Sequence, residues 1–305
     1  MSVPVDDFVL GIDLGGTKIA LATADTNGTI LYRQTIATLA SQGAEQAIER
    51  TIASGRDLVE QTQRRWHGRL AGVGIATMGI TLDDRVLMVP NVPGWDRLAL
   101  PSQMQQAFVL DAIRIENDVK AAACAELRWG ALAGVETGLY LNLGTGIAAT
   151  LVVNGRILHG THGAAGEIAY NLRHLHDEQG FSAGKAPLEE FVGGGAIRER
   201  VRLRFGAEST VEEIFRKATA APLDPEARAF VEATLTEIAF HLTNMTIALD
   251  PERVVIGGGL MRSKALILPR LAAHIRRFVP FPPQVEEAHF SHDAGIRGAI
   301  ALAIH

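Results

Sequence analysis

Residues 11–20 read Gly-Ile-Asp-Leu-Gly-Gly-Thr-Lys-Ile-Ala, and they predict two apolar strands joined by a glycine turn. Asp13 places a carboxylate on the first strand, while Thr17 and Lys18 place a hydroxyl and a cation at the bend. Glycines let the backbone approach a ligand closely, so that N–H groups can point at phosphate oxygens. A carboxylate beside such a turn can organise Mg²⁺ through water, because Mg²⁺ binds few protein carboxylates directly. Taken alone, the pattern also fits an ordinary turn between two strands.

A second stretch repeats this pattern. Residues 139–153 read Leu-Tyr-Leu-Asn-Leu-Gly-Thr-Gly-Ile-Ala-Ala-Thr-Leu-Val-Val, so that Asn142 corresponds to Asp13 and a Gly-Thr-Gly turn follows. Two such hairpins, far apart in the chain, indicate a duplicated fold whose halves face each other across a cleft, with one hairpin holding each end of a polyphosphate. The chain has neither a P-loop of the form G-x-x-x-x-G-K-[ST] nor a G-x-G-x-x-G between a strand and a helix, which excludes those two kinds of nucleotide site.

A third glycine-rich element follows a predicted buried strand. Residues 250–260 read Asp-Pro-Glu-Arg-Val-Val-Ile-Gly-Gly-Gly-Leu. Pro251 ends the preceding helical pattern, and the apolar run 254–256 predicts a parallel strand. Ligands of open α/β sheets bind outside the carboxyl ends of the strands, where these glycines would leave room for a flat adenosine. The alternative is that they form a mobile loop between a strand and a helix.

In order and spacing, these three elements resemble the phosphate 1, phosphate 2 and adenosine motifs of the actin-like ATPase superfamily. Within it they resemble those of the ROK group (repressors, open reading frames, sugar kinases). The match continues through residues 91–95, 116–118 and 163–168, so the resemblance covers nearly the whole chain.

The resemblance implies both a fold and an activity. The fold is α/β, a two-lobed actin-like ATPase (ribonuclease H-like) fold with the active site in the cleft between the lobes. Residues 1–116 with 294–305 would form a smaller N-terminal lobe, and residues 117–293 a larger C-terminal lobe. The activity is that of a sugar kinase, which transfers the γ-phosphoryl group of ATP to a hexose hydroxyl with the help of Mg²⁺. The resemblance also implies a homodimer.

Nucleotide-binding roles follow from the same resemblance. Asp13 would hold Mg²⁺, through water. The residues assigned to ATP are those of the three glycine-rich turns: Gly15, Gly16, Thr17, Lys18, Gly144, Thr145, Gly146, Gly257, Gly258 and Gly259.

Asp118 is the candidate catalytic residue. It follows a predicted strand at 112–116 and begins a helix at 119–130, so it could simply cap that helix, a role that Asn117 could equally fill. Phosphoryl transfer needs in-line positioning, Mg²⁺ and a base that orients the attacking hydroxyl. The resemblance to ROK kinases assigns that base to Asp118.

Sugar-binding residues are likewise implied by the resemblance. Asn91 and Asn117 match asparagines that bind sugar hydroxyls, and Asp118 would contact the reacting hydroxyl. Glu167 and Glu189 match two sugar-binding glutamates of the group. Without the family, Glu167 reads as a solvated loop charge and Glu189 as a carboxylate favoured at a helix start.

The chain departs from the family at a zinc motif. Many ROK proteins carry Cys-x-Cys-Gly-x-x-Gly-Cys-x-Glu; ending these positions at Glu189 puts Gly180, Ser182 and Pro187 where the cysteines would be. Tyr170 replaces the zinc-binding His of the Gly-Glu-x-Gly-His pattern. We therefore expect no structural zinc, and Tyr170 leaves the identity of the sugar open. The candidates for a substitute metal site are the nearby histidines His159, His162, His174 and His176.

The composition narrows the class of protein. With 305 residues, 47% of them hydrophobic, the chain can bury the cores of two lobes. Its formal charge of −5 gives no basic face for nucleic acid or an anionic membrane, and it has no apolar run of about 18 residues that would span one. Cys124 is the only cysteine, which favours the reducing cytoplasm. The acidic N-terminus lacks a signal-peptide pattern.

Three alternatives differ in function. A ROK-type sugar-sensing regulator would carry a winged-helix segment before the first phosphate strand, whereas only residues 1–10 precede Gly11. A degenerate kinase would have lost Asp118, Asp13 or the glycines, and all are present. An enzyme of the same fold that uses polyphosphate as donor remains an alternative. Glucose phosphorylated at O6 is the first choice of substrate, ahead of mannose, fructose, N-acetylhexosamines or a glycoside.

Hydrophobic periodicity predicts the remaining elements. Those expected in the second half are strands at 137–145, 147–159 and 253–257 and helices at 189–204, 210–219, 225–249 and 294–305, with glycine- and histidine-rich loops over about 160–190. By resemblance, the last of these helices packs on the first lobe.

Overall fold

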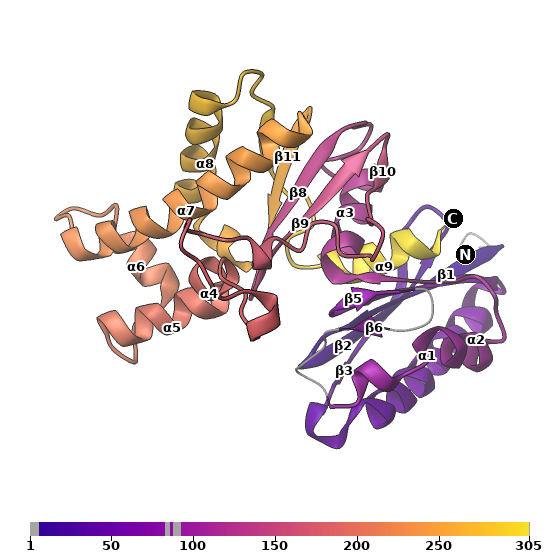
Figure 1. Ribbon diagram of the computed structural model, residues 1–305. Coiled ribbons are helices and arrows are strands. Elements are labelled where there is room, and N and C mark those ends of the chain that lie inside the picture. The colour runs from indigo at the N-terminus through magenta and orange to yellow at the C-terminus, as the bar shows by residue number, and fades with distance from the viewer. Residues whose placement is uncertain (1–5, 83–85, 88–92, 305) are drawn as a thin grey trace. The chain divides into compact units, whose positions relative to one another are not determined.

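The computed structural model describes residues 6–82, 86–87 and 93–304 of the chain (Figure 1). These residues divide into two compact units. The first unit contains the described residues of 1–129, 159–164 and 292–305, and the second contains residues 130–158 and 165–291.

The first unit is built on a five-stranded sheet. Its strands, in spatial order, are β3 (Ile30–Ala37), β2 (Lys18–Asp25), β1 (Asp7–Leu14), β4 (Arg69–Thr77) and β7 (Ile113–Asn117). β3, β2 and β1 pair antiparallel, whereas β4 pairs in parallel with both β1 and β7. The other elements are the paired strands β5 (Ile80–Thr81) and β6 (Val86–Leu87), the helices α1 (Ala44–Trp66), α2 (Leu100–Phe108), α3 (Asp118–Trp129) and α9 (Ala294–Ala303), and 3-10 helices at Ala40–Gln42 and Trp95–Arg97.

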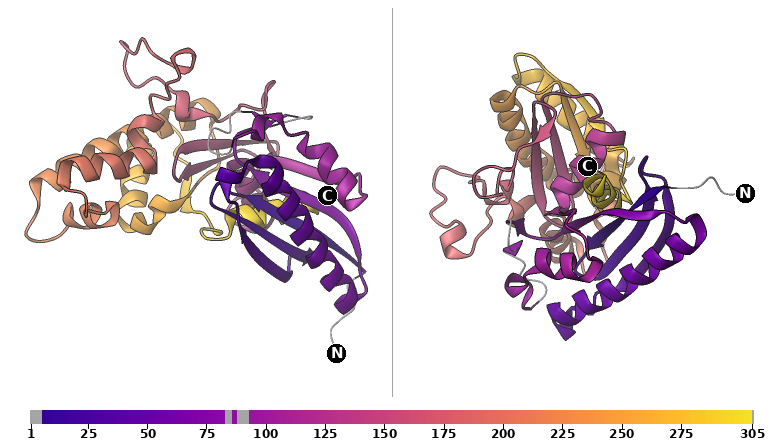
Figure 2. Two further views of the ribbon diagram at one scale, coloured as in Figure 1. Left: turned by 90° about the horizontal axis from the view of Figure 1, so that it is seen from below. Right: turned by 90° about the vertical axis from the view of Figure 1, so that its right-hand side faces the viewer.

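Different helices cover the two faces of this sheet, because side chains alternate along β1. Leu10 and Ile12 pack into the core formed with α1. Gly11 faces α9 instead, and a Cβ there would lie 2.7 Å from the Ile300 side chain. Figure 2 shows α1 along one side of the N-terminal strands and the yellow helix α9 on the other. By the same alternation, Asp13 belongs to the α9 face.

Helix α3 belongs to the first unit because it packs against α9. Gly298 of α9 lies so near that a Cβ there would be 2.4 Å from the backbone oxygen of Ala121. The lobe boundary expected after residue 116 differs from this division, since it assigned α3 to the C-terminal lobe. Tertiary packing between two helices of small residues, rather than chain order, decides where α3 lies.

The second unit repeats the strand arrangement of the first. Its strands, in spatial order, are β10 (Arg156–Ile157), β9 (Ile147–Val153), β8 (Gly138–Leu143), β11 (Arg253–Gly257) and β12 (Gln284–Glu287). Again three strands pair antiparallel and two follow in parallel. The strand expected to reach residue 159 ends at Val153, because Asn154 and Gly155 both take positive φ (54° and 66°) and turn the chain into β10.

Helices of the second unit surround one large apolar core (Figure 1). They are α4 (Glu189–Val192), α5 (Gly194–Phe205), α6 (Val211–Lys217), α7 (Pro225–Leu249) and α8 (Lys264–Phe278), with 3-10 helices at Ile168–Tyr170, Phe181–Ala183 and Gly259–Ser263. The single helix expected over 189–204 is divided into α4 and α5, because Gly193 is extended (ψ 143°). No helix in the described parts of the chain is long and apolar enough to cross a membrane.

Candidate active site

The β1–β2 turn presents Thr17 and Lys18 to solvent. The Gly15 N–H donates to the Lys18 carbonyl at 3.1 Å, and a Cβ at Gly15 would lie 2.7 Å from that same oxygen. Thr38 follows β3, is fully buried and holds the turn through two hydrogen bonds. Its hydroxyl donates to the Gly15 carbonyl at 2.6 Å, and its N–H donates to the Thr17 carbonyl at 3.0 Å. The turn therefore requires glycine at its first position and holds its polar side chains outward.

Asp13 lies half-buried just before this turn. Burial raises the pKa of its carboxyl to about 6, the Asp118 carboxylate adds to the rise, and Lys18 and Arg33 oppose it. Gly295 leaves the space that this carboxyl occupies, because a Cβ there would lie 2.4 Å from Oδ2. Two carboxylates that repel each other suit a divalent cation, which would relieve that repulsion.

The donor set fits Mg²⁺ better than a metal enclosed by protein. Among the described residues there is no group of three or more His, Cys, Asp or Glu side chains that could hold a metal ion. Mg²⁺ keeps several waters and takes one or two carboxylates together with substrate phosphates. Asp13, beside the exposed turn of Thr17 and Lys18, fits that requirement.

Asn117, rather than Asp118, caps helix α3. The Asn117 Oδ1 accepts from the N–H groups of Val119 at 2.9 Å and Lys120 at 3.3 Å, and its Nδ2 donates to the Gly79 carbonyl at 2.7 Å. Among the described residues no acceptor is found for its second Nδ2 hydrogen, which could donate to a ligand. Asn117 therefore suffices as the cap, and the Asp118 carboxylate shares with it only the Val119 N–H.

Asp118 itself is accessible to solvent at the start of α3. One carboxylate oxygen accepts from the Val119 N–H at 2.9 Å. The protein around the carboxyl limits its hydration, and this burial raises its pKa, while the Val119 N–H and the Lys120 ammonium oppose the rise. An accessible carboxylate with a raised pKa has the properties of a general base.

Two side-chain contacts beside Asp118 were not foreseen from the sequence. Glu116 accepts from the Asn117 N–H at 2.8 Å and contacts His159 Nε2 at 2.5 Å. Lys120, only 2% exposed, donates from Nζ to the Gly163 carbonyl at 2.9 Å. Together they attach residues 159–164 to the first unit. The unusual lysine within a run of alanines was the available signal, and His159 had been considered only as a metal ligand.

The second hairpin turn is supported by a run of glycines. The N–H of Gly194 donates to the Gly144 carbonyl at 3.1 Å, and that of Gly195 donates to the Thr145 carbonyl at 2.8 Å. A Cβ at Gly194 would lie 2.3 Å from the Gly144 oxygen. The start of α5 can therefore lie this close to the turn only because residue 194 is glycine. The three successive glycines 193–195 signalled this close approach in the sequence and were missed.

Glu189 also lies against this turn. Its Oε2 accepts from the Ile147 N–H at 3.1 Å, and a Cβ at Gly146 would lie 2.0 Å from the same oxygen. Burial raises the pKa of Tyr170, and the carboxylates of Glu167 and Glu189 raise it further. The second unit thus brings Glu167 and Glu189 near Tyr170, and Glu189 contacts the Gly-Thr-Gly turn. Asn91 lies outside the described residues.

Packing accounts for two of the glycines predicted to clear an adenosine site. A Cβ at Gly257 would lie 2.4 Å from the Tyr140 hydroxyl. Gly258 has φ +96°, and a Cβ there would meet the Leu143 backbone at 2.4 Å. At Gly259, by contrast, no described atom lies within 4 Å of that position, so this glycine leaves open space.

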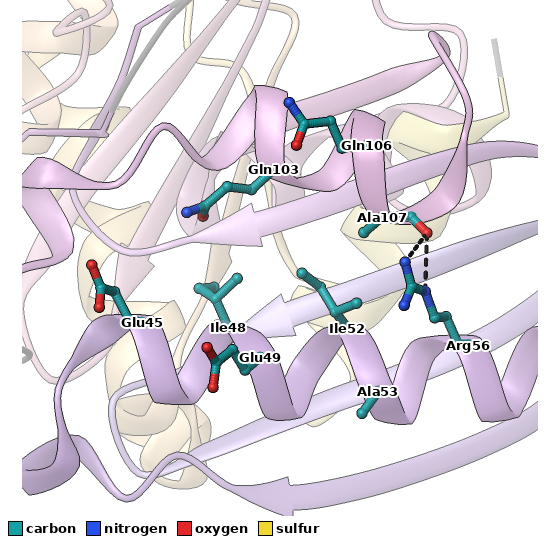
Figure 3. A pocket seen from close by; sticks show the side chains of 9 residues that line it. All are labelled: Glu45, Ile48, Glu49, Ile52, Ala53, Arg56, Gln103, Gln106 and Ala107. Atoms are coloured by element: carbon teal, nitrogen blue, oxygen red, sulfur yellow. Dashed lines mark hydrogen bonds between the residues drawn. The ribbon is translucent and has the colours of Figure 1, made fainter.

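A separate groove of about 530 Å³ lies between α1 and α2 (Figure 3). Ile48 and Ile52 line it, and Arg56 donates twice to the Ala107 carbonyl, at 3.0 and 2.8 Å. α1 covers the sheet face opposite α9, so the groove is on the side away from Asp13. None of the candidate residues lines it.

Comparison with known proteins places the chain in a family. Residues 9–305 match the ROK family. The N-acetylmannosamine kinase of Pasteurella multocida is 30% identical over 298 residues, which cover 95% of this chain and 94% of that protein. The ROK hexokinase from Thermus thermophilus superposes with a TM-score of 0.80 at 28% identity, covering 97% of both chains. The ROK family glucokinase from Streptomyces griseus, solved with glucose and AMPPNP, superposes with a TM-score of 0.74 at 26% identity. The match covers 97% of this chain and 99% of that one. The chain therefore has the actin-like ATPase fold and belongs to the ROK family.

Proposed function

We propose that the protein is an ATP-dependent sugar kinase that phosphorylates a hexose hydroxyl, with O6 of glucose as the first choice. The observation that carries this proposal is the accessible Asp118 carboxylate at the start of a helix that Asn117 already caps. The neighbouring Asp13, whose pKa is raised to about 6, and the outward-facing turn of Thr17 and Lys18 support it.

In the proposed reaction, the carboxylate of Asp118 accepts the proton of the attacking sugar hydroxyl. The hydroxyl oxygen forms its bond to the γ-phosphorus while the bond from that phosphorus to the β–γ bridging oxygen breaks, and ADP leaves with the electron pair. Mg²⁺, held by Asp13, would neutralise charge on the phosphate oxygens when bound. The glycine turns and Lys18 would hold the phosphates, at Gly15, Gly16, Thr17, Gly144, Thr145 and Gly146, and Gly257, Gly258 and Gly259 would border the adenosine.

Several polar side chains would bind the sugar. Asn117 retains one donor, and Glu167 and Glu189 provide acceptors for hydroxyls. Glu189 already accepts the Ile147 N–H, so it can connect the sugar site to the phosphate turn. Tyr170, beside both glutamates, would contribute a phenol hydroxyl. Because the relatives include both a glucokinase and an N-acetylmannosamine kinase, the preferred sugar must be determined by assay.

The test is ADP release with a panel of sugars, followed by mass spectrometry of the product. We expect sugar-dependent ADP formation with Mg²⁺, and the highest kcat/KM with glucose among glucose, mannose, fructose, N-acetylglucosamine and N-acetylmannosamine. Polyphosphate replaces ATP in a parallel series. A protein that phosphorylates no sugar of the panel would overturn the kinase proposal, and faster transfer from polyphosphate than from ATP would overturn the choice of donor.

A further inference from the structure

The segment between the two candidate sugar residues Tyr170 and Glu189 is a long loop (Figure 2, left). Three of its apolar side chains, Leu172, Leu175 and Phe181, are exposed, whereas Leu188 at its end is buried in the large core. Such a loop cannot be fixed by an apolar core of its own. Its position must come from contacts at its two ends and from the ring of Phe181, which packs edge-on against the ring of Tyr170 with centroids 5.4 Å apart.

Arg173 provides the strongest of these contacts. Its Nε donates to Glu237 Oε1 at 2.9 Å and its Nη2 to Oε2 at 3.4 Å, a two-armed pair with side chains 20% and 17% exposed. The guanidinium also lies over the ring of Phe191, with Cζ 3.6 Å from the ring centroid. Partly buried, two-armed pairs of this kind are geometrically restrictive and are weakened little by solvent.

The neighbouring contacts extend this attachment. Asn171 Nδ2 donates to Nδ1 of His241, at 3.3 Å, one helical turn after Glu237 on α7. Burial lowers the pKa of His241, so its ring is neutral near pH 7 and can accept this bond. Arg200 also lies over the Phe191 ring, at 3.8 Å, and donates to the Phe191 carbonyl at 2.8 Å.

These contacts connect the loop to a helix that packs in the large core of the unit. Helix α7 carries Glu237 and His241 on one side and contributes Leu235, Ile238 and Leu242 to the large core. Phe191 lies two residues after Glu189, and Arg173 lies three residues after Tyr170. A backbone bond of 3.2 Å from the Leu188 N–H to the Ala169 carbonyl joins the two ends of the loop.

We propose that Arg173 is a positioning residue, which through Glu237 and Phe191 holds Tyr170 and Glu189 in place for the sugar. That these two residues meet sugar rests on the proposed function; that Arg173 orders the loop does not. An ion pair and an aromatic ring thus hold this end of the segment. Arg173 binds Glu237 through its planar, two-armed guanidinium and also stacks on the Phe191 ring. A lysine could therefore restore these contacts only in part.

The kinetic test compares Arg173→Ala, Arg173→Lys and Glu237→Gln with Arg204→Ala. Arg204 is the matched control, because it pairs with Glu226 between α5 and α7 at 2.9 Å but lies outside the loop. We expect Arg173→Ala and Glu237→Gln to raise the KM for sugar about tenfold, with the KM for ATP changed less than about twofold. Arg173→Lys should recover part of the loss. Equal increases in both KM values, or a fall in kcat alone, would overturn the proposal.

Hydrogen exchange tests the same proposal without any kinase activity. In the ligand-free protein, peptides covering 167–177 and 186–192 should exchange about tenfold faster in Arg173→Ala and Glu237→Gln than in the wild type, while α8 stays unchanged. Arg204→Ala should match the wild type in the loop. Unchanged exchange in both loop peptides would show that Arg173 does not order the segment, whatever the protein phosphorylates.

Discussion

The two units share one strand order but differ at the turn that each presents. In the first unit the turn follows a carboxylate, Asp13, and is braced by the side chain and backbone of Thr38. In the second unit the equivalent position is the neutral Asn142, and the turn is braced by the glycines that begin α5 and by Glu189. The two units thus have the same strand arrangement, but different side chains lie at their turns.

The two units also differ in the candidate functional residues that they contain. The two aspartates with raised pKa values, Asp13 and Asp118, belong to the first unit, whereas Glu167, Tyr170 and Glu189 gather in the second. We infer that the first unit carries the chemical step and that the second carries most of the sugar contacts. Changes to each unit should therefore produce different kinetic and thermodynamic effects.

The largest expected effect is in the first unit. Asp118→Asn keeps the size of the side chain and can still accept the Val119 N–H, but it cannot take up the hydroxyl proton. We expect kcat to fall about 10²-fold or more, with the affinities for ATP and sugar largely kept. Steady-state rates and calorimetric titration of both ligands measure the two quantities. A variant that retains more than about a tenth of the wild-type kcat would remove Asp118 from the role of base.

The two turns should respond differently to added methyl groups. At Gly146 a Cβ would displace Glu189 Oε2, which lies 2.0 Å away, and would break its bond to the Ile147 N–H. At Gly16 the nearest atom to such a Cβ is Met78 Sδ, at 3.5 Å. We expect Gly146→Ala to lower the free energy of unfolding by about 2 kcal/mol, and Gly16→Ala by less than about 0.5 kcal/mol. Urea unfolding measures both, and equal losses would contradict the contrast.

A smaller effect depends on pH. Because the pKa of Asp13 is raised from 3.8 to about 6 on folding, the folded state binds more protons than the unfolded state in this range, and stability falls as pH rises from about 4 to 7. Asp13→Asn removes this penalty. Without Mg²⁺ the variant should gain about 1 kcal/mol on the wild type between pH 4 and pH 7, a value reduced from the full shift because Asp13 is only half-buried. A difference that does not vary with pH would show that Asp13 ionises normally.

The smallest expected effect is that of a chelator. Tyr170, Gly180, Ser182 and Pro187 stand where zinc-containing relatives have their ligands, and the pair of Arg173 with Glu237 attaches the loop instead. We expect the purified protein to hold no stoichiometric zinc and its Tm to be unchanged by chelator. Elemental analysis showing about one zinc per chain, with a lower Tm in chelator, would contradict this.

Local patterns were sufficient to predict the frame of the fold. The first hairpin, the second hairpin and the strand before Gly257 all form where alternation and glycines indicated. Turn chemistry that depends on one residue was harder to predict. The interruption at Gly193 is an example, because glycine inside a helical pattern only weakens a helix unless packing selects another conformation.

Contacts between distant residues could not be predicted from the sequence. The pairs of Glu116 with His159 and of Arg173 with Glu237 join residues 43 and 64 positions apart, with no motif to relate them. The choice between Asn117 and Asp118 as helix cap depended on side-chain conformation, which adjacent residues of equal capping propensity cannot reveal. The assigned roles of Glu167 and Glu189 in sugar binding remain predictions.

We propose that the second unit binds the sugar through the segment that contains Glu167, Tyr170 and Glu189. The deciding experiment is hydrogen exchange of the wild-type protein with glucose alone, with an ATP analogue alone and with neither. We predict that saturating glucose slows exchange across 165–190 by about tenfold or more, and that the ATP analogue alone leaves this segment nearly unchanged. Unchanged exchange in this segment with a sugar that the protein phosphorylates would contradict the claim.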